Sequence, residues 1–267
     1  MGAAMPSTAS EPRPDLSVVL PAFNEAENID AAVGRCLDVA ARLAIEVEVL
    51  VVDDGSCDAT AERVAAWTAR DARVRMVRHP SNLGYGAALR SGLTAAEGTR
   101  VFFTDADLQF DLTELDGLLA RSDEADILAG YRAPRRDPWH RCLNGWLWSR
   151  LVDLLFSTGV RDVDCAFKLF HRDVLAHVPI RSMGAFVNTE ILVRARAAGF
   201  RVVEVPVKHL PRVAGRATGA DPRVIVRAFV ELASLWVELR ALVRRGPEGT
   251  TRPARQTART PGGGRPS

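Results

Sequence analysis

The chain has 267 residues, of which 47% are hydrophobic and 25% charged, which is enough to bury the core of one large domain or two small ones. Its formal charge of +2 creates no general attraction for nucleic acid, so a nucleic-acid partner is not expected. The four cysteines form no CxxC pair, which excludes a disulfide framework or a zinc site of that kind and favours reduced thiols in a cytoplasmic setting.

Both ends of the sequence are predicted to be disordered tails. Residues 1–14 are rich in Ala, Ser, Pro and Glu, and residues 246–267 consist mainly of Gly, Pro, Thr and Arg. Such segments bury too little apolar surface to offset the entropy of ordering. We find no signal-peptide pattern and no run of about 18 apolar residues that predicts a spanning helix.

The first half of the chain alternates apolar runs with helical patterns. Leu16–Ala22 reads as a strand that closes at Pro21, and Asn24 is expected to cap a helix beginning near Glu25. Val47–Val52 reads as a second buried strand and ends in Asp53-Asp54-Gly55-Ser56. A helix is predicted after this polar cluster.

The pattern continues with two further strands. Val74–Val77 is the third, Gly84 and Gly86 open another helix, and Arg100–Thr104 is the fourth strand. Strands that alternate with helices of 10–15 residues indicate an α/β fold with a mostly parallel sheet and helices on both faces. The carboxyl ends of such strands share one edge, where ligands bind.

Two acidic side chains follow the fourth strand. Asp105 and Asp107 are one residue apart, so they point the same way if strand geometry persists. Two like charges held together favour a cation between them, and carboxylate oxygens suit Mg²⁺ or Mn²⁺. The alternative is a solvated turn, in which Asp is common.

Several motifs together resemble glycosyltransferase family 2, the nucleotide-sugar-dependent enzymes of GT-A fold. Within that family the chain looks most like the dolichyl- or polyprenyl-phosphate mannose and glucose synthases. The matching stretches, in chain order, are 18–25, 51–60, 82–86, 105–109, 130–132, 164–168 and 211–215. The resemblance implies a Rossmann-like GT-A sheet and a nucleotide diphosphate sugar as donor.

The same resemblance implies roles for the residues at the strand ends. Metal ligands would be Asp105, Asp107 and Gln109, with Asp107 also catalytic. The donor would be held by Pro21, Phe23, Glu25, Val51, Asp53, Asp54, Asp105 and Ala106. Arg212 resembles the family's diphosphate-binding arginine, although Thr218 stands where a lysine is usual.

Cationic residues follow a further strand at Ile127–Gly130. The resemblance assigns Arg132 to the phosphate of a lipid acceptor, and Arg141 to a second contact with it. Guanidinium groups bind phosphate in two-pronged, selective geometry. The alternative is a solvated basic helix face with Trp139, Trp146 and Trp148 at the core or an interface.

Other titratable residues remain open between catalytic and structural roles. Asp162 and Asp164 are candidate bases for a hydroxyl acceptor, with Asp164 the residue assigned to catalysis; the alternative is that either orients arginines. Lys168 is expected to form a local ion pair. Glu190 is either an acid near the acceptor or a surface residue, and His209 is the one histidine not treated as merely structural.

The last helix is predicted over Pro222–Arg244 and is amphipathic rather than membrane-spanning. We expect a catalytic domain over residues 15–220, with the helix at 221–245 packed on it, on a membrane surface or on a partner chain in a homodimer. The predicted location is cytoplasmic, extending to the inner face of the membrane.

Three functions are therefore compared. The first is an inverting, metal-dependent hexosyltransferase that moves the sugar to a polyprenyl phosphate. The second is a family 2 enzyme with a hydroxyl acceptor, either a saccharide or a small metabolite. The third is a non-catalytic partner that binds a nucleotide sugar.

Overall fold

The computed structural model describes residues 13–211 and 222–245. Arg212, Thr218, most of the first predicted tail and all of the second therefore lie outside the described residues. Among those described, no helix combines the length and the apolarity needed to cross a bilayer.

A seven-stranded sheet forms the centre of the molecule, in the order β3-β2-β1-β4-β6-β5-β7. Its strands are β1 (Leu16–Ala22), β2 (Val47–Asp53), β3 (Val74–Arg78), β4 (Arg100–Thr104), β5 (Ile127–Arg132), β6 (Phe167–His171) and β7 (Val202–Val207). The largely apolar composition of β1 and β2 is explained by burial on both faces of the sheet, since every residue of both strands is buried.

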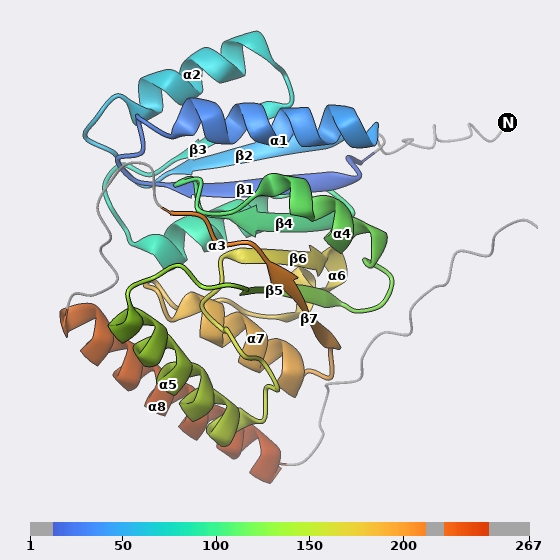
Figure 1. Cartoon of the computed structure of the whole chain (residues 1–267). Helices are drawn as coiled ribbons and strands as arrows, with labels where there is room; N and C mark the ends of the chain where they lie inside the picture. Colours follow the sequence, from blue (N-terminus) through green and yellow to red (C-terminus); the bar gives the residue numbers. More distant parts are fainter. Residues whose placement is uncertain (1–12, 212–221, 246–267) are drawn as a thin grey trace, which may run out of the picture.

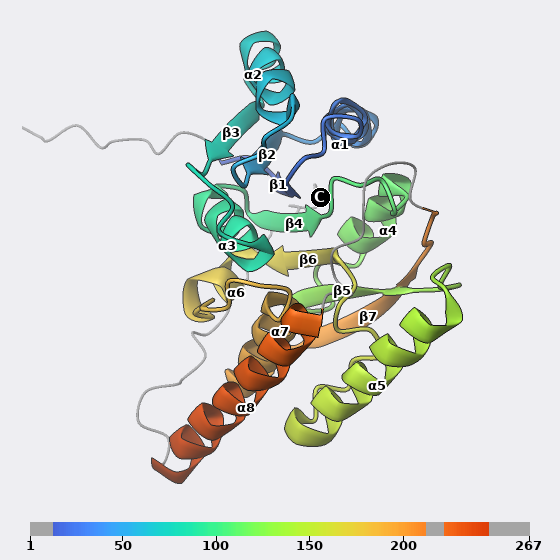
Figure 2. The same cartoon turned by 90° about the vertical axis from the view of Figure 1, so that its left-hand side faces the viewer.

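Helices cover both faces of this sheet, as the sequence predicts (Figures 1 and 2). They are α1 (Ile29–Leu43), α2 (Thr60–Arg70), α3 (Tyr85–Ala95), the 3₁₀ turn η1 (Leu112–Glu114), α4 (Leu115–Ala120), α5 (Trp139–Phe156), α6 (Arg172–His177), α7 (Val187–Ala197) and α8 (Pro222–Arg245). In Figure 2, α1 and α4 lie on one side of the sheet and α3 and α6 on the other.

One strand of the sheet runs against the others. β6 pairs antiparallel with both β4 and β5, with Leu169 opposite Phe102 on one side and Leu128 on the other. Aromatic packing secures it, because Phe167 meets Phe102 edge-on at 4.7 Å between ring centroids. The fold is therefore a mixed but mostly parallel α/β sheet.

The strand directions bring distant parts of the sequence to one edge. β1, β2 and β4 are parallel, β5 regains their direction across β6, and β7 is parallel to β5. The segments that follow Ala22, Asp53, Thr104, Arg132 and Val207 therefore all leave the sheet at the same edge.

Candidate active site

The loops after β1 and β2 are joined by a row of hydrogen bonds. The Asn24 amide N–H donates to Ser56 Oγ at 3.0 Å, and the Cys57 N–H donates to Asn24 Oδ1 at 2.9 Å. The Glu25 N–H donates to Thr60 Oγ1 at 2.9 Å. The predicted helix cap at Asn24 is thus wrong: Asn24 has a φ of +56°, which Asn tolerates, and α1 starts only at Ile29.

Asp53 presents a buried carboxylate at this edge. Its Oδ1 accepts the N–H of Ser56 at 3.1 Å. Its Oδ2 is buried and accepts no hydrogen bond from the described residues, although Arg78 Nε lies 3.2 Å away as an ion-pair partner. A buried acceptor without a donor is costly, so this oxygen is suited to an N–H of a bound base.

The remaining residues predicted for the nucleoside are divided between surface and interior. Phe23 is 40% exposed, and its ring is available as an aromatic wall. Glu25 is half-buried and accepts from Asn28 Nδ2 at 2.7 Å. Pro21 and Val51 are buried within β1 and β2, so their side chains pack inside the protein beneath the loops of the site.

Asp54 has its oxygens occupied by the protein. Its carboxylate contacts His79 Nδ1 at 2.7 Å and accepts the N–H groups of Leu83 and Gly84 at 3.0 and 2.9 Å. The other nitrogen of His79 contacts Ser91 Oγ at 2.9 Å. These contacts give Asp54 the role of holding the segment before α3, and its predicted contact with substrate stays a prediction.

The start of α3 is fitted closely to a distant segment. Gly84 has a φ of +102°, and a Cβ there would lie 2.4 Å from the Met183 carbonyl oxygen. The same oxygen accepts the N–H of Gly86 at 2.9 Å. This fit presents Tyr85, whose hydroxyl donates to Asp105 Oδ1 at 2.9 Å.

Asp105 and Asp107 lie in a turn, not in a strand. β4 ends at Thr104, and the chain reverses through Leu108, which has a φ of +61°. The strand therefore does not continue through Asp105 and Asp107, and the predicted alternative of a turn is correct for the backbone. Nevertheless both carboxylates act on one neighbour, since burial first and then the charges of Asp105 and Asp107 raise the pKa of Tyr85.

A residue one hundred positions away completes this turn. Phe110 forms a β-bridge with His209, and Gln109 Nε2 lies 3.4 Å from His209 Nε2. The Arg136 N–H donates to His209 Nδ1 at 3.2 Å. Burial lowers the pKa of His209 more than the charge of Asp137 raises it, so the imidazole is neutral near pH 7.

The residues predicted as metal ligands have suitable donor chemistry. Within the described part of the chain no group of three or more His, Cys, Asp or Glu side chains is arranged to hold a metal ion. The predicted set differs from such a group, because it consists of two carboxylates and the amide of Gln109. Asp107 is buried and its Oδ1 accepts the Gln109 N–H at 3.1 Å. Oxygen donors of this kind fit Mg²⁺ or Mn²⁺ with ligands left for a diphosphate.

Arg132 is held in a two-pronged ion pair at the other part of the edge. Its Nε and Nη2 each donate to Asp162 at 2.7 Å, and Asp137 lies 3.5 Å from Nη1. Burial would raise the pKa of Asp162, but the hydrogen bonds and charge of Arg132 outweigh it and the pKa is lowered. Asp162 is therefore ionised and committed to Arg132, which removes it as a candidate base.

Two more guanidinium groups gather on Asp137. Arg135 Nε donates to its carboxylate at 2.8 Å, and Arg141 Nη1 lies 3.9 Å from it. Arg136 next to them is exposed. Arg132, Arg135 and Arg141 thus contact Asp137 or Asp162, and the exposed Arg136 adds a further positive charge next to them in the chain.

Asp164 differs from its neighbour Asp162. It is half-buried and accepts no hydrogen bond from the described residues. Burial, and then the charge of Asp162, raises its pKa to about 6. A carboxylate with that pKa and a free oxygen has the properties of a general base near neutral pH.

Lys168 and Glu190 shape the surrounding loops from inside the protein. The buried ammonium of Lys168 donates to the carbonyls of Val163 and Cys165, and no carboxylate of the described residues forms the expected ion pair with it. Glu190 is buried as well, which excludes the surface alternative. It accepts the N–H groups of Arg181 and Ser182 at 2.9 and 2.8 Å, next to the segment that contacts α3.

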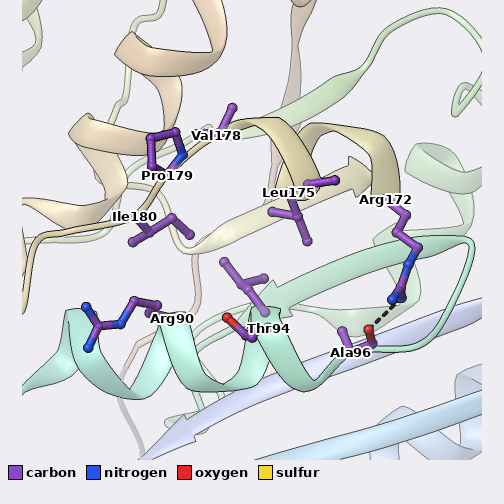
Figure 3. Close-up of a pocket in the computed structure, with 10 residues that line it drawn as sticks. Arg90, Thr94, Ala96, Arg172, Leu175, Val178, Pro179 and Ile180 are labelled. Carbon is purple, nitrogen blue, oxygen red and sulfur yellow. Dashed lines mark hydrogen bonds between the residues drawn. The ribbon is translucent and has the colours of Figure 1, made fainter. Parts of the chain in front are cut away.

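A hollow of about 380 Å³ lies away from these residues. Figure 3 shows it between α3 and α6, with Thr94 on one wall and Leu175 and Ile180 on the other. None of the residues predicted for the donor, the metal or the acceptor lines it. The candidate active site is therefore the sheet edge and not this hollow.

Comparison with known proteins identifies the family of this chain. The sequence profile of glycosyl transferase family 2 matches residues 17–178. Glycosyltransferase AglD of Haloferax volcanii is 35% identical over 217 residues, which cover 78% of this chain and 35% of AglD. The chain therefore belongs to glycosyl transferase family 2, and it spans about a third of the length of that curated relative.

Solved structures confirm the fold. Glucosyl-3-phosphoglycerate synthase from Mycobacterium tuberculosis, in complex with Mn²⁺, UDP-glucose and phosphoglyceric acid, superposes with a TM-score of 0.65 at 21% identity, covering 84% of this chain and 80% of that one. A second mycobacterial protein gives 0.63 at 23% identity, covering 84% and 75%. At these identities the likeness establishes the GT-A fold predicted from the sequence.

Proposed function

We propose that this chain is an inverting, metal-dependent hexosyltransferase that moves a sugar from a nucleotide diphosphate sugar to a polyprenyl phosphate. The observation that carries the acceptor class is the cluster of Arg132, Arg135 and Arg141 around Asp137 and Asp162, with the exposed Arg136 next to it in the chain. Counting Arg136, the four guanidinium groups exceed the three carboxylates Asp137, Asp162 and Asp164 by one when all three are ionised. A phosphate monoester, a dianion near neutrality, matches this excess charge.

The donor would bind where the loops after β1, β2 and β4 meet. Phe23 offers an apolar wall to the base, and the unsatisfied Oδ2 of Asp53 accepts a base N–H. Asp105, Asp107 and Gln109 would hold Mg²⁺ or Mn²⁺, which supplies charge neutralisation to the diphosphate leaving group. His209 lies against Gln109 and fixes the turn that carries these ligands.

The acceptor phosphate would be placed by the arginine cluster. Arg132 is kept rigid by Asp162, whereas Arg141 has only a 3.9 Å contact with Asp137 and Arg136 is exposed, so both have donors left for a phosphate. A phosphate oxygen needs no base to attack the anomeric carbon, because it is already ionised. The arginines therefore act by orientation and charge, and Arg212 stays a predicted diphosphate ligand.

A hydroxyl acceptor is the second candidate function, and Asp164 favours it. A sugar or metabolite hydroxyl must lose its proton during attack, and Asp164 has the raised pKa and free carboxylate that this requires. The resemblance of Mycobacterium tuberculosis glucosyl-3-phosphoglycerate synthase, crystallised with phosphoglyceric acid, is one of fold only.

One experiment separates the two. Purified enzyme is given radiolabelled GDP-mannose, UDP-glucose or UDP-N-acetylglucosamine with Mn²⁺, and either a polyprenyl phosphate or a hydroxyl acceptor. We expect transfer to the polyprenyl phosphate that survives Asp164→Asn and falls in Arg141→Ala. Transfer to hydroxyl acceptors alone, abolished by Asp164→Asn, would refute the proposal. Calorimetric titration of the same donors with and without Mn²⁺ tests the donor site independently.

A further inference from the structure

Helix α5 has an apolar stripe that the protein does not cover. Only Ser149 and Val152 of its residues are buried. Trp139 and Leu154 are 78% and 81% exposed. The exposed large side chains recur at helical spacing along one face of α5: Trp139, Leu143, Trp146, Leu147 and Leu154. An exposed apolar face of this length indicates a surface that contacts a protein or a membrane.

Helix α8 lies beside α5 at the end of the molecule opposite α2 (Figures 1 and 2). The two helices touch where Trp148 meets Phe229 at 5.4 Å between ring centroids. Leu232 and Leu235 of α8 are buried, whereas Val226, Val230 and Val237 are more than half exposed at helical spacing. We call the exposed stripes of the two helices the α5–α8 face.

Cations without acidic partners border this face. The Arg150 guanidinium lies over the Trp146 ring at 5.7 Å, and that of Arg240 lies over Trp236 at 3.9 Å. Within the described residues neither forms an ion pair with a carboxylate, and neither does the exposed Arg136, three residues before α5. Tryptophan with arginine at an apolar boundary is typical of side chains at a membrane interface.

The acids on the two helices are already engaged. Asp153 accepts the Gly159 N–H at 2.6 Å, and Glu231 accepts from Arg227. Glu238 pairs with Arg194 and Arg181. The α5–α8 face is thus apolar and cationic. Two copies meeting through it about a two-fold axis would set like charges against each other, which disfavours a homodimer here.

We infer that the α5–α8 face docks on an anionic phospholipid bilayer, with the apolar stripes in the headgroup region and the arginines on lipid phosphates. This inference rests on the proposed function, since a polyprenyl phosphate resides in a bilayer. The geometry is consistent, because α5 begins two residues after Asp137, so the docking face adjoins the arginine cluster. The acceptor phosphate would then reach the site without leaving the membrane surface.

Vesicle co-sedimentation of the full chain tests the docking. We expect binding to phosphatidylcholine:phosphatidylglycerol vesicles (3:1) that is about tenfold tighter than binding to pure phosphatidylcholine. The double variant Trp146→Asp/Leu154→Asp is expected to weaken binding at least about tenfold, and Arg150→Gln about fivefold on anionic vesicles alone. Ala66→Asp, on the exposed side of α2 at the opposite end, is the matched control and should bind unchanged.

Two further measurements keep the outcomes distinct. Thermal melting by circular dichroism shows that the variants are folded, and transfer to a water-soluble short-chain prenyl phosphate measures the active site without a membrane. Loss of vesicle binding by the double variant with retained transfer supports the docking face. Vesicle binding without transfer to any lipid phosphate supports the face and refutes the proposed function. Unchanged vesicle binding by the double variant, or a dimer in light scattering that this variant dissociates, overturns the inference.

Discussion

Replacing Asp162 with asparagine tests the buried ion pair at the acceptor edge. In the wild-type protein Asp162 accepts two hydrogen bonds of 2.7 Å from Arg132, and the two side chains are only 10% and 12% exposed. Removing one partner of a buried pair costs about 3–5 kcal/mol. Asparagine keeps one acceptor oxygen, and Asp137 remains 3.5 Å from Arg132, so we expect a loss of about 2–4 kcal/mol.

The exposed pair of Arg73 and Asp71 supplies a matched control. It has the same two-pronged geometry, at 2.9 and 2.6 Å, but its side chains are 45% and 22% exposed. Asp71→Asn should therefore cost less than about 1 kcal/mol. Urea unfolding of the wild type and both variants measures the free energies of unfolding, and equal losses in the two variants would refute the effect of burial.

Measuring the same variant at low pH separates the effect of charge on stability from the effect of packing. The pKa of Asp162 is lowered in the folded state, so its contribution to stability is present above the unfolded pKa of about 4 and is lost as the pH falls through the folded pKa. The difference between wild type and Asp162→Asn should therefore be full at pH 7 and shrink below pH 4. A difference independent of pH would mean that packing, not charge, accounts for the loss.

Three further predictions concern the site itself. Asp164 has a folded pKa of about 6, above its unfolded value, so its ionisation destabilises the protein as the pH rises from 4 to 6. In urea unfolding, Asp164→Asn should match the wild type at pH 4 and be about 2 kcal/mol more stable than it at pH 8. Equal stability of the two proteins at both pH values would contradict this. Gly86→Ala would place a Cβ 2.5 Å from the Ser182 oxygen and 2.7 Å from that of Gly184, so thermal melting should show a loss of about 1–3 kcal/mol, with weaker donor binding by calorimetry. Removing divalent metal with EDTA should abolish transfer, and Mn²⁺ should restore it in wild type but not in Asp107→Asn; restoration in both would exclude Asp107 as a ligand.

The donor half of the site could be predicted from the sequence because each part of it is local. The strands were expected at Leu16–Ala22 and Arg100–Thr104 and lie there, and Val47–Val52 differs from β2 by one residue. A buried parallel strand followed at once by polar residues identifies a carboxyl end without knowledge of its neighbours. The parallel direction then brings these ends together.

Local rules failed where a distant segment determines the backbone. Asn24 leaves the cap position because the loop after β2 supplies it with partners 32 and 33 residues away. The strand reasoning for Asp105 and Asp107 fails similarly, since pairing of Phe110 with His209 favours a turn. β6 has a buried lysine in an otherwise apolar run, and its antiparallel insertion between β4 and β5 depends on aromatic contacts that no local pattern reveals.

The acceptor half shows the same limit in its chemistry. From the sequence, Arg132 is the candidate for an acceptor phosphate, and Asp162 and Asp164 are alternative bases for a hydroxyl acceptor; only the pairing of Arg132 with Asp162, thirty residues away, distinguishes the two acids. The pairing engages Asp162 and lowers its pKa. The charge of Asp162 in turn helps burial to raise the pKa of Asp164. One ion pair therefore creates both a rigid cation, to which we assign the acceptor phosphate, and a carboxylate suited to act as a base. The arginine cluster and Asp164 are built from the same contacts, so the acceptor class depends on which of these two the acceptor contacts. Comparing transfer by Arg141→Ala with transfer by Asp164→Asn measures this directly.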